Sequence, residues 1–451
     1  MKVISYGAAK TVTGSAHMLI LDDKKILIDC GLFQGVDEEK SEELGFDPKE
    51  VDAVLLTHAH IDHCGRIPML IKNGFKGKIY CTNPTYELSR LMLLDTAKVM
   101  LENYKSHMRR FQRGSIKEMP SEPLYDEDDV FEALEHFEPI FSYNKTYDVL
   151  GAKVTPKDAG HILGSCFYEI EYKDKRIVFS GDLGNKGKPI VRDFSLPSKA
   201  NVVYVESTYG DRLHKSFDQS KEELKEIIKN TIKHGNVLIP SYALERTQDI
   251  LYVLREFYEE GSLPKCKIFL DSPLAIGVTK VFLRNKEYFR KETYDIMQKE
   301  DPFSLPYLTM VRDVEESKQI NDIQEGAIII AGSGMLSGGR ILHHIRHHAY
   351  KEQNAIVFVG YQPHGTLGRR ILEKQNPVFV MGEPINIRAK IYTVNGFSSH
   401  ADQSELIEWV NAANPEKICL IHGEEDKMLV LKDKLGNKNV YIPSRKEVID
   451  V

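Results

Sequence analysis

The sequence has few of the features that mark secreted or membrane proteins. Its 451 residues contain six cysteines at scattered positions with no CxxC pair, which indicates buried thiols in a reducing compartment rather than a disulfide framework. No stretch reaches the roughly 18 consecutive apolar residues that a membrane helix needs. The first residues, Met1–Gly7, read as a β-strand and lack the apolar core of a signal peptide. We therefore expect no membrane association and a cytoplasmic location.

The chain also has no overall excess of positive charge. Its formal net charge is −6, with 28% charged and 42% hydrophobic residues. This balance argues against a protein that coats nucleic acid non-specifically, although it allows a groove with local positive charge. The length exceeds that of an ordinary single domain, so two domains are expected.

Against this background, one run of six residues holds four candidate metal ligands. His58, His60, Asp62 and His63 follow a short apolar run, residues 51–57, of the kind that buried strands carry. In an extended backbone, residues two apart point the same way, so the first two imidazoles can share one ion. The other two ligands come where a helix is expected to begin, and a turn there can direct them to a second ion. Imidazole and carboxylate suit zinc, and also manganese or iron. The alternative is an exposed polar loop.

Four further apolar segments end in a candidate ligand or acid. A single histidine at a strand end is usually a satisfied structural residue. The same placement on several strands, in a chain that also holds the first run, is hard to explain by packing alone. The residues concerned are His161, Asp182, Glu206 and His422.

These residues suggest a two-metal site as a hypothesis. One ion would be bound by His58, His60 and His161, the other by Asp62, His63 and His422, with Asp182 bridging them. An open position at such an ion would hold a water whose pKa falls to about 7. A hydroxide between two ions roughly 3.5–4 Å apart suits in-line attack on a phosphodiester.

The pattern of the chain changes at about Gly210. From there, apolar strands alternate with helices, which predicts a parallel sheet covered on both faces. After about Ile385 the pattern returns to that of the first region. We therefore predict one domain, residues 1–208 and 385–451, interrupted by an inserted domain, residues 209–384.

A glycine-rich loop follows one of these inserted strands. The segment Gly332–Arg340 (GSGMLSGGR) opens a predicted helix, and its backbone N–H groups could hold a phosphate. A plain turn is the alternative. The candidate phosphate contacts are Ser333, Gly334 and Ser337 in the loop, and Arg246 elsewhere. The four histidines of the helix are interpreted as a partly solvated face rather than a separate metal site: His343, His344, His347 and His348.

Taken together, the motifs resemble those of the metallo-β-lactamase superfamily. The first three are HAHIDH, GHILGS at His161 and SGDLG at Asp182. More narrowly, VESTYGDR at Glu206, GFSSHADQ at His400 and LIHGEE at His422 resemble the three motifs of its β-CASP branch, which processes nucleic acids. The segments GSGMLSGGR and GYQPHGTLGR also resemble that branch. The resemblance covers nearly the whole chain. Within the branch, the chain resembles the RNA-processing members: the cleavage-and-polyadenylation endonuclease subunit, ribonuclease J and compact bacterial relatives.

The resemblance implies an α/β fold and a reaction. The fold would be a four-layer αβ/βα metallo-β-lactamase domain with an inserted parallel-sheet α/β (β-CASP) domain, and the protein a zinc-dependent ribonuclease acting in the cleft between them. His400 would contact a phosphate or act as the general acid for the leaving oxygen, oriented by Glu206, and Asp62 is counted among the catalytic residues as well as the ligands. A histidine at the position of His422 is typical of the RNA-acting members. Two zinc ions, or manganese, RNA as the substrate and a homodimer are the associated expectations.

Two other functions stay open. A hydrolase of small thioester or lactam substrates could use the same metal core, but it would leave the inserted domain, His400 and the glycine loop unexplained. A non-catalytic RNA-processing scaffold would be expected to lack ligands, and every ligand type is present. Relative to the larger relatives, we expect no N-terminal RNA-binding extension and no additional C-terminal domain. Internal cleavage and trimming from one end are both compatible with the sequence.

Overall fold

The chain forms two compact units in the computed structural model, which describes residues 1–362, 365–436 and 438–451. Unit 1 comprises residues 1–184, 194–213 and 400–451, and unit 2 comprises residues 185–193 and 214–399. The changeovers at 213/214 and 399/400 lie downstream of the domain limits predicted at 208/209 and 384/385, and the short segment 185–193, predicted for the first domain, is grouped with unit 2. The second difference arises because β19 (Lys390–Thr393) pairs in parallel with β16 (Ala355–Phe358) and so belongs to the sheet of unit 2.

Unit 1 contains two seven-stranded sheets. The strands of the first are β1 (Lys2–Gly7), β2 (Ala16–Leu21), β3 (Lys24–Ile28), β4 (Ala53–Leu55), β5 (Lys78–Thr82), β6 (Phe137–Phe141) and β22 (Val448–Asp450), in the order β22-β1-β2-β3-β4-β5-β6. Those of the second are β7 (Tyr147–Val149), β8 (Ala152–Asp158), β9 (Cys166–Tyr172), β10 (Lys175–Phe179), β11 (Val202–Glu206), β20 (Lys417–Ile421) and β21 (Val440–Tyr441), in the order β21-β20-β11-β10-β9-β8-β7. The strands of one domain thus come from both ends of the chain.

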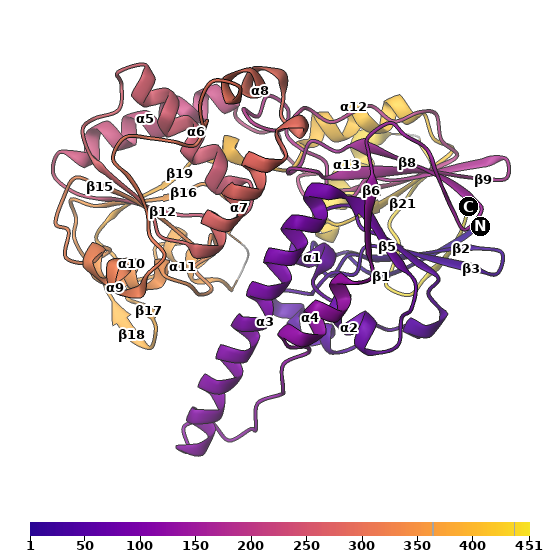
Figure 1. Ribbon diagram of the computed structural model, residues 1–451, viewed down its shortest axis with the longest axis horizontal. Helices are drawn as coiled ribbons and strands as arrows, with labels where there is room; N and C mark the ends of the chain where they lie inside the picture. The colour runs from indigo at the N-terminus through magenta and orange to yellow at the C-terminus, as the bar shows by residue number, and fades with distance from the viewer. Residues whose placement is uncertain (363–364, 437) are drawn as a thin grey trace. The chain divides into compact units, whose positions relative to one another are not determined.

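Three apolar cores arrange unit 1 in four layers. One core lies between the two sheets and takes side chains from both, such as Leu19 and Tyr168. A second lies under the helices of the N-terminal half, and a third under those of the C-terminal part, where Trp409 is fully buried. The helices are α1 (Ile61–Cys64), α2 (Ile67–Lys72), α3 (Asn83–Gln112), α4 (Glu127–Leu134), α12 (Gln403–Ala413) and α13 (Glu425–Leu435), with 3-10 turns η1 (Gly35–Glu42) and η2 (Pro48–Glu50) (Figure 1). This arrangement confirms the predicted αβ/βα fold.

The parallel strands of unit 1 gather polar residues at one edge. β11 (VVYVE) is buried at every position and rich in β-branched residues, as a strand covered on both faces should be. It pairs in parallel with β10 and with β20. Because the carboxyl ends of parallel strands meet at the same edge of a sheet, Glu206 at the end of β11 lies at the same edge as Asp182 and His422, which come after β10 and β20.

Unit 2 is built on a parallel sheet, as predicted from its alternating strands and helices. Its strands are β12 (Val237–Pro240), β13 (Lys267–Leu270), β14 (Leu308–Met310), β15 (Ala327–Ala331), β16 and β19, in the order β14-β13-β15-β12-β16-β19, with β17 (Val378–Val380) and β18 (Glu383–Ile385) forming a separate hairpin. All five pairings in the six-stranded sheet are parallel. The helices are α5 (Phe217–Ile232), α6 (Arg246–Glu259), α7 (Pro273–Arg284), α8 (Lys291–Met297), α9 (Val314–Ile320), α10 (Ile341–His348) and α11 (Leu367–Leu372), with turns η3 (Lys286–Tyr288) and η4 (Asn395–Phe397). Helices α5, α6 and α7 cover one face of the sheet, and α9, α10 and α11 the other (Figure 1).

Within the described parts of both units, no helix combines the length and the apolar character that crossing a bilayer requires.

Candidate metal centre

The ligand-rich run lies between β4 and α1. After β4 the backbone stays extended, and His60 takes the N-cap position of α1 with φ −66° and ψ 146°. Asp62 and His63 are on the single turn of α1, so the helix changes their direction relative to the two preceding histidines. The predicted turn between the two ligand pairs is therefore a short helix.

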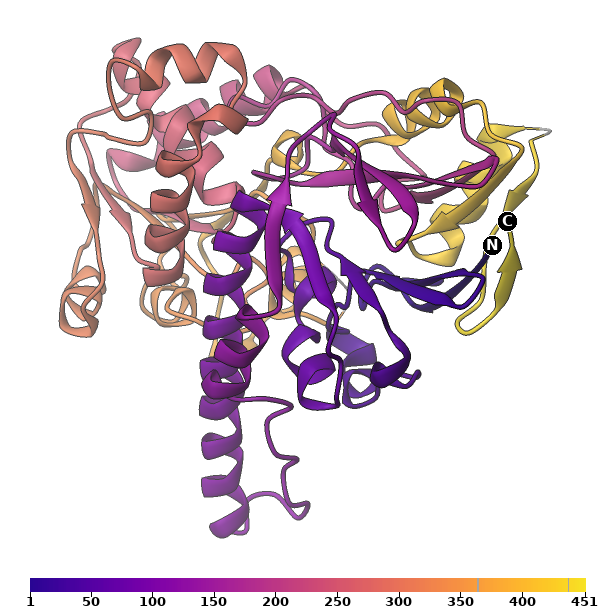
Figure 2. The ribbon, with the colours of Figure 1, turned by 45° about the vertical axis from the view of Figure 1, so that its right-hand side comes forward.

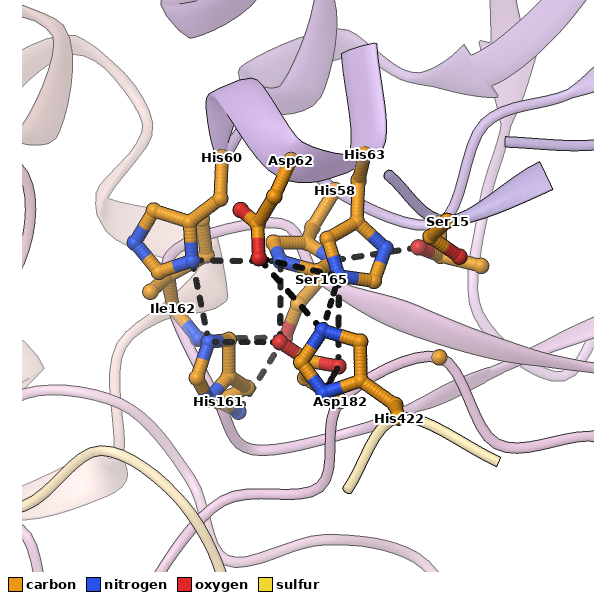
Figure 3. Close-up of polar contacts among 12 residues, drawn as sticks. Ser15, His58, His60, Asp62, His63, His161, Ile162, Ser165, Asp182 and His422 are labelled. Atoms are coloured by element: carbon orange, nitrogen blue, oxygen red, sulfur yellow. Dashed lines mark hydrogen bonds and ion pairs between the residues drawn. The ribbon is translucent and has the colours of Figure 1, made fainter. Parts of the chain in front are cut away.

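Three histidines converge on one side of the site (Figure 3). His58 Nε2 lies 3.1 Å from His60 Nδ1, and His161 Nε2 lies 3.1 Å from the same nitrogen. Asp182 Oδ2 lies 3.5 Å from His58 Nε2 and 3.6 Å from His161 Nε2. Three imidazole nitrogens and one carboxylate oxygen thus form the kind of donor set that a tetrahedral metal site uses.

Asp62, His63 and His422 converge beside them. His63 Nε2 lies 3.1 Å from His422 Nε2, and Asp62 Oδ2 lies 3.9 Å from the first and 3.4 Å from the second of these nitrogens. His422 follows β20 with a φ of +49°, a conformation that costs free energy for a residue other than glycine and that is concentrated at functional sites. The structure therefore brings together the three residues predicted for a second ion.

Asp182 lies between the two groups (Figure 3). While its Oδ2 faces His58 and His161, its Oδ1 lies 3.3 Å from His63 Nε2 and 3.5 Å from His422 Nδ1. This Oδ1 is buried and has no hydrogen-bond partner among the described residues. A buried carboxylate oxygen without a donor is costly unless a cation takes that place.

The electrostatics of the site favour the metal-binding form of three candidate ligands, His58, His60 and Asp182, and the protonated form of a fourth, His63. Burial lowers the pKa of His58 well below its usual value and that of His60 to about 4, so both imidazoles are neutral at pH 7. Burial alone would raise the pKa of Asp182, but the neighbouring imidazoles outweigh it and hold that pKa well below its usual value. Burial also lowers the pKa of His63, but the surrounding carboxylates outweigh it and raise that pKa well above its usual value. A field that favours protons on one imidazole also favours a metal cation.

Asp29 is a further residue of the site, which the sequence reading missed. It follows β3, is 1% exposed, and accepts hydrogen bonds from His63 Nδ1 at 2.7 Å and from the Thr57 backbone N–H at 2.8 Å. The bond to Nδ1 fixes the ring and leaves Nε2 directed at His422 and Asp182. The sequence does contain a pattern that could have identified Asp29. Residues 26–29 are an apolar run that ends in a carboxylate, which is the same pattern that identified Asp182.

A close approach of two loops sets the spacing of two ligands. A Cβ on Gly184 would lie 1.7 Å from the Gly160 carbonyl oxygen, and the Gly184 N–H donates to the Ala159 carbonyl at 2.8 Å. Gly160 immediately precedes His161, and Gly184 is two residues after Asp182. Only a glycine lets the two backbones come this close, so a side chain at this position would separate the histidine from the carboxylate.

Glu206 and His400 form a pair next to Asp182. The buried Glu206 carboxylate accepts hydrogen bonds from the Leu183 backbone N–H at 2.8 Å and from His400 Nδ1 at 3.1 Å. His400 Nδ1 lies 3.9 Å from Asp182 Oδ2, and the His400 side chain is 22% exposed. Burial lowers the pKa of His400, but the Glu206 carboxylate outweighs it and raises that pKa to about 9. The pair therefore keeps a protonated, partly accessible imidazole beside the cluster at pH 7.

The glycine loop expected to bind phosphate lies in unit 2, between β15 and α10. Ser333 Oγ accepts hydrogen bonds from the backbone N–H groups of Ser337 at 2.9 Å and Gly338 at 3.3 Å. The hydroxyl of the loop thus occupies two of the N–H groups that a phosphate would use, and Gly334 lies between the two serines. Phosphate binding by this loop remains a prediction.

Arg246, the other predicted phosphate contact, is the first residue of α6. It is 5% exposed, and its guanidinium donates to Ser399 Oγ at 3.1 Å, within unit 2. A buried guanidinium needs partners of this kind. In the GYQPHGTLGR motif, Pro363 and His364 lie outside the described residues.

The histidines of α10 serve the fold of unit 2. His344 and His348 are buried, so the predicted solvated face holds for the exposed His343 and His347 and is wrong for the other two. His344 Nε2 lies 2.7 Å from Oδ2 of the fully buried Asp271. Among the residues that the structure describes, metal-ligand types gather into groups only in unit 1, at the clusters of Asp182 and of Asp62.

The residues of unit 1 fit divalent metal ions. Within each group the ligand atoms lie within 4.8 Å of one another. Two nitrogens bound at about 2.0–2.1 Å to one tetrahedral ion stand about 3.3 Å apart, close to the 3.1 Å between the His58 and His60 nitrogens. Four buried or half-buried carboxylates surround these imidazoles and supply the negative charge that such ions require: Asp29, Asp62, Asp182 and Glu206.

Three family models match successive parts of the chain. A metallo-beta-lactamase superfamily domain matches residues 18–204, a Beta-Casp domain residues 247–371, and a Zn-dependent metallo-hydrolase RNA specificity domain residues 384–443. These matches confirm the resemblance drawn from the motifs. The first match holds His58 through Asp182, and the third holds His400 and His422.

The relatives of the chain agree with the family models. The chain is 42% identical to Ribonuclease TTHA0252 of Thermus thermophilus over 96% of its own length and 95% of that protein. It is 31% identical to Transcription termination factor FttA of Methanocaldococcus jannaschii, over 100% of this chain and 72% of that protein. A crystal structure of a protein of unknown function from Enterococcus faecalis V583 aligns over 99% of both chains with a TM-score of 0.55 and 14% identity, which is a likeness of fold.

Proposed function

This chain belongs to the β-CASP ribonuclease family of the metallo-β-lactamase superfamily, and from that membership we propose that it hydrolyses RNA phosphodiester bonds at the candidate metal centre with two divalent ions. The imidazole-rich donor set favours zinc, with manganese as the second choice. RNA is supported as the substrate by the match to an RNA specificity domain and by the two relatives, one named a ribonuclease and the other a transcription termination factor.

The observation that carries the proposal is the position of Asp182. Its two oxygens face two different histidine-containing groups, and one of them has no hydrogen-bond donor among the described residues. A bridging carboxylate of this kind is what a two-metal site needs to hold its ions together. A structural aspartate would instead be surrounded by N–H and O–H donors.

Each group would hold one ion through its own side chains. When bound, such ions polarise a phosphoryl oxygen and lower the pKa of a water molecule. Asp29 would keep the His63 ring in the orientation and tautomer that present Nε2. The proposed ligands are His58, His60 and His161 on one side, Asp62, His63 and His422 on the other, and Asp182 on both.

We assign proton transfer to the Glu206–His400 pair. Cleavage of a phosphodiester leaves an alkoxide oxygen, which needs a proton or a positive charge beside it. His400 is protonated at pH 7 because its pKa is raised to about 9, and its Nδ1 is held by Glu206 Oε1, so Nε2 carries the proton that can be given away. Asp62, which is half-buried, is proposed both as a metal ligand and as a catalytic residue.

The other functions considered predict different behaviour. A small-substrate hydrolase would turn over a thioester or lactam faster than RNA. A non-catalytic scaffold would bind RNA without hydrolysing it, whether or not metal is present. A homodimer and a cytoplasmic location remain predictions, the first to be measured by light scattering of the purified protein.

The test uses one RNA oligonucleotide labelled at either the 5′ or the 3′ end. We expect metal-dependent cleavage that a chelator abolishes and added zinc or manganese restores, and the two product ladders distinguish internal cutting from trimming. Thioester and lactam substrates serve as the comparison. No cleavage of any RNA by protein that contains both metals would overturn the proposal.

His400→Ala is the matched variant for this experiment. It removes the proposed acid without removing a ligand, so the protein should retain its metal content by elemental analysis and lose roughly 10²–10⁴-fold in cleavage rate. Unchanged cleavage would remove His400 from the mechanism while leaving the metal assignment intact.

A further inference from the structure

Helix α3 continues well past the core that it covers. Its buried side chains end at Ala97, although the helix runs to Gln112. The chain then returns to α4 through residues 113–126 without a further helix or strand. Both views show this extension leaving the sheets of unit 1 (Figures 1 and 2). We call residues 101–123 the α3 arm, since Met100, Leu124 and Tyr125 still pack against the core.

The packing of unit 1 does not account for the arm. The helix residues of the arm, 101–112, form about three turns without a buried residue and gain little from tertiary contacts, and an isolated helix of this length is only marginally stable in water. Connections of more than about 12 residues without secondary structure are uncommon in compact domains and are usually functional. The arm therefore requires an explanation outside the core.

The arm carries more positive than negative charge, because its acidic residues, Glu102, Glu118 and Glu122, lie on either side of a longer run of cations. Residues 103–117 contain five cationic side chains and no aspartate or glutamate, in a chain whose formal net charge is −6. All five are exposed, and among the described residues none forms an ion pair with a carboxylate. By contrast Lys98, at the base of the arm, pairs with Glu127 at 3.3 Å. The five residues are Lys105, Arg109, Arg110, Arg113 and Lys117. Cations without internal counter-ions are available to a polyanion.

The end of the arm is also hollowed. Helix and return segment enclose an open hollow of about 580 Å³, lined by His107, Arg110, Ile116, Lys117, Met119 and Pro120, with Glu118 also in its wall. An imidazole and apolar side chains here stand beside two cations. Proteins bind single-stranded nucleic acid where bases stack on aromatic rings or guanidinium planes and cations contact the backbone, and His107, Arg110 and Lys117 provide such groups.

Helix α3, which carries the arm, is fixed at its N-terminus to a loop of the candidate metal centre. Thr82 Oγ1 and Thr85 Oγ1, at the N-terminus of α3, donate to the Gly164 carbonyl at 2.7 and 3.1 Å. Gly164 lies in the loop that carries His161. From Thr85 to Arg110 the helix spans about 40 Å at roughly 1.5 Å per residue. A stacked strand that rises roughly 3.4 Å per nucleotide would cover that distance with about a dozen nucleotides.

We propose that the α3 arm is a second RNA-binding element, which holds the phosphodiester backbone about a dozen nucleotides from the bond that is cut. The identity of its ligand rests on the proposed function, whereas its charge and its distance from the metal centre do not. A protein partner is the less favoured occupant, because the exposed large apolar side chains of the arm are two, Leu101 and Met119, against five exposed cations. The arm should thus contribute to the affinity for long RNAs and not to hydrolysis itself.

The test compares RNA lengths in a variant without three of the cations. In R109S/R110S/R113S, the dissociation constant of a fluorescent single-stranded 25-mer, measured by anisotropy in chelator, should rise at least about 10-fold near 0.1 M salt, and the salt dependence should weaken by a slope of about 2. Binding of a 5-mer and its cleavage with metal restored should be unchanged. The matched control K2S/K153S/K432S removes three exposed lysines elsewhere in unit 1 that form no ion pair among the described residues. It should change neither the dissociation constant of the 25-mer nor its salt dependence.

The outcomes separate this inference from the proposed function. An unchanged 25-mer affinity in the triple variant, in protein that cleaves RNA, overturns the role of the arm alone and points to a protein partner. Equal losses in the triple variant and the lysine control would also overturn it, since they would reflect overall charge. Arm-dependent binding by a protein that cleaves no RNA would support the arm and reject the nuclease.

Discussion

Two buried clusters of histidine and aspartate, one in each unit, use the same residue types in opposite ways. In unit 2, Asp271 accepts hydrogen bonds from His344 Nε2 at 2.7 Å, Ser317 Oγ at 2.6 Å and Arg340 Nη1 at 2.6 Å. Both oxygens of this carboxylate have donors. In unit 1, Asp182 is surrounded by imidazoles at 3.3–3.6 Å, and its Oδ1 has no hydrogen-bond donor among the described residues.

The difference distinguishes a structural cluster from a metal site. A fully satisfied buried network rigidifies the fold and needs nothing further. Where two imidazole nitrogens face each other, as those of His63 and His422 do at 3.1 Å, either a proton or a metal cation must lie between them. The two clusters should therefore respond differently to the same substitution.

The largest effect is expected for Asp182→Asn. The change keeps the shape of the side chain but removes the charge that the two proposed ions share. Bound metal should therefore fall, and the rate of RNA cleavage should drop by about 10³-fold or more. At about 1.4 kcal/mol for each tenfold change, this is a loss of about 4 kcal/mol of transition-state stabilisation. Metal content by elemental analysis and cleavage of labelled RNA measure the two effects, while the circular dichroism spectrum should stay that of the parent. Full metal content with full turnover would reject the bridging assignment.

The same change in the other cluster, Asp271→Asn, should act on stability alone. Removing the carboxylate leaves Arg340 and His344 without their buried anion, and breaking a buried ion pair costs about 3–5 kcal/mol. The expected result is a lower melting temperature with normal metal content and normal cleavage in the remaining folded protein. Loss of metal in this variant would mean that the clusters are not independent, and the comparison would fail.

The sequence could predict which candidate ligands come together, because their residue type and their position agree. His58 and His60 stand two apart after an apolar run, and the strand-end residues Asp182 and His422 follow parallel neighbours, so their convergence follows from the geometry of a parallel sheet. The same reasoning cannot separate Asp182 from Asp271, which also follows an apolar strand. The donors that satisfy Asp271 come from distant positions, and only the tertiary structure shows them.

Two other features could not be obtained from the sequence. The apolar residues of α3 recur at helical spacing, and Tyr104, Met108 and Phe111 continue that spacing beyond Met100, which still packs against the core, so nothing in the pattern marks where burial ends. The phosphate role of Ser333 also depended on pattern alone. In the structure its hydroxyl accepts from the backbone of its own loop, a contact that glycine-rich sequences do not reveal.

The smallest effect, and the one that sharpens the comparison most, concerns pH. The pKa of His400 is about 9, so its proton is present below that pH and is lost above it; cleavage should therefore decline about tenfold per pH unit above pH 9. Burial raises the pKa of Asp271, but its hydrogen bonds from His344, Ser317 and Arg340 outweigh burial and lower that pKa below 3.8. The Asp271 carboxylate therefore stays ionised, and the melting temperature should not follow the decline in cleavage.

Glu206→Gln removes the carboxylate that raises the pKa of His400. The alkaline limb of the pH–rate profile should therefore move toward the ordinary histidine pKa near 6.5. A limb that stays at pH 9 in this variant would assign the titration to another group and leave His400 without its role as the acid.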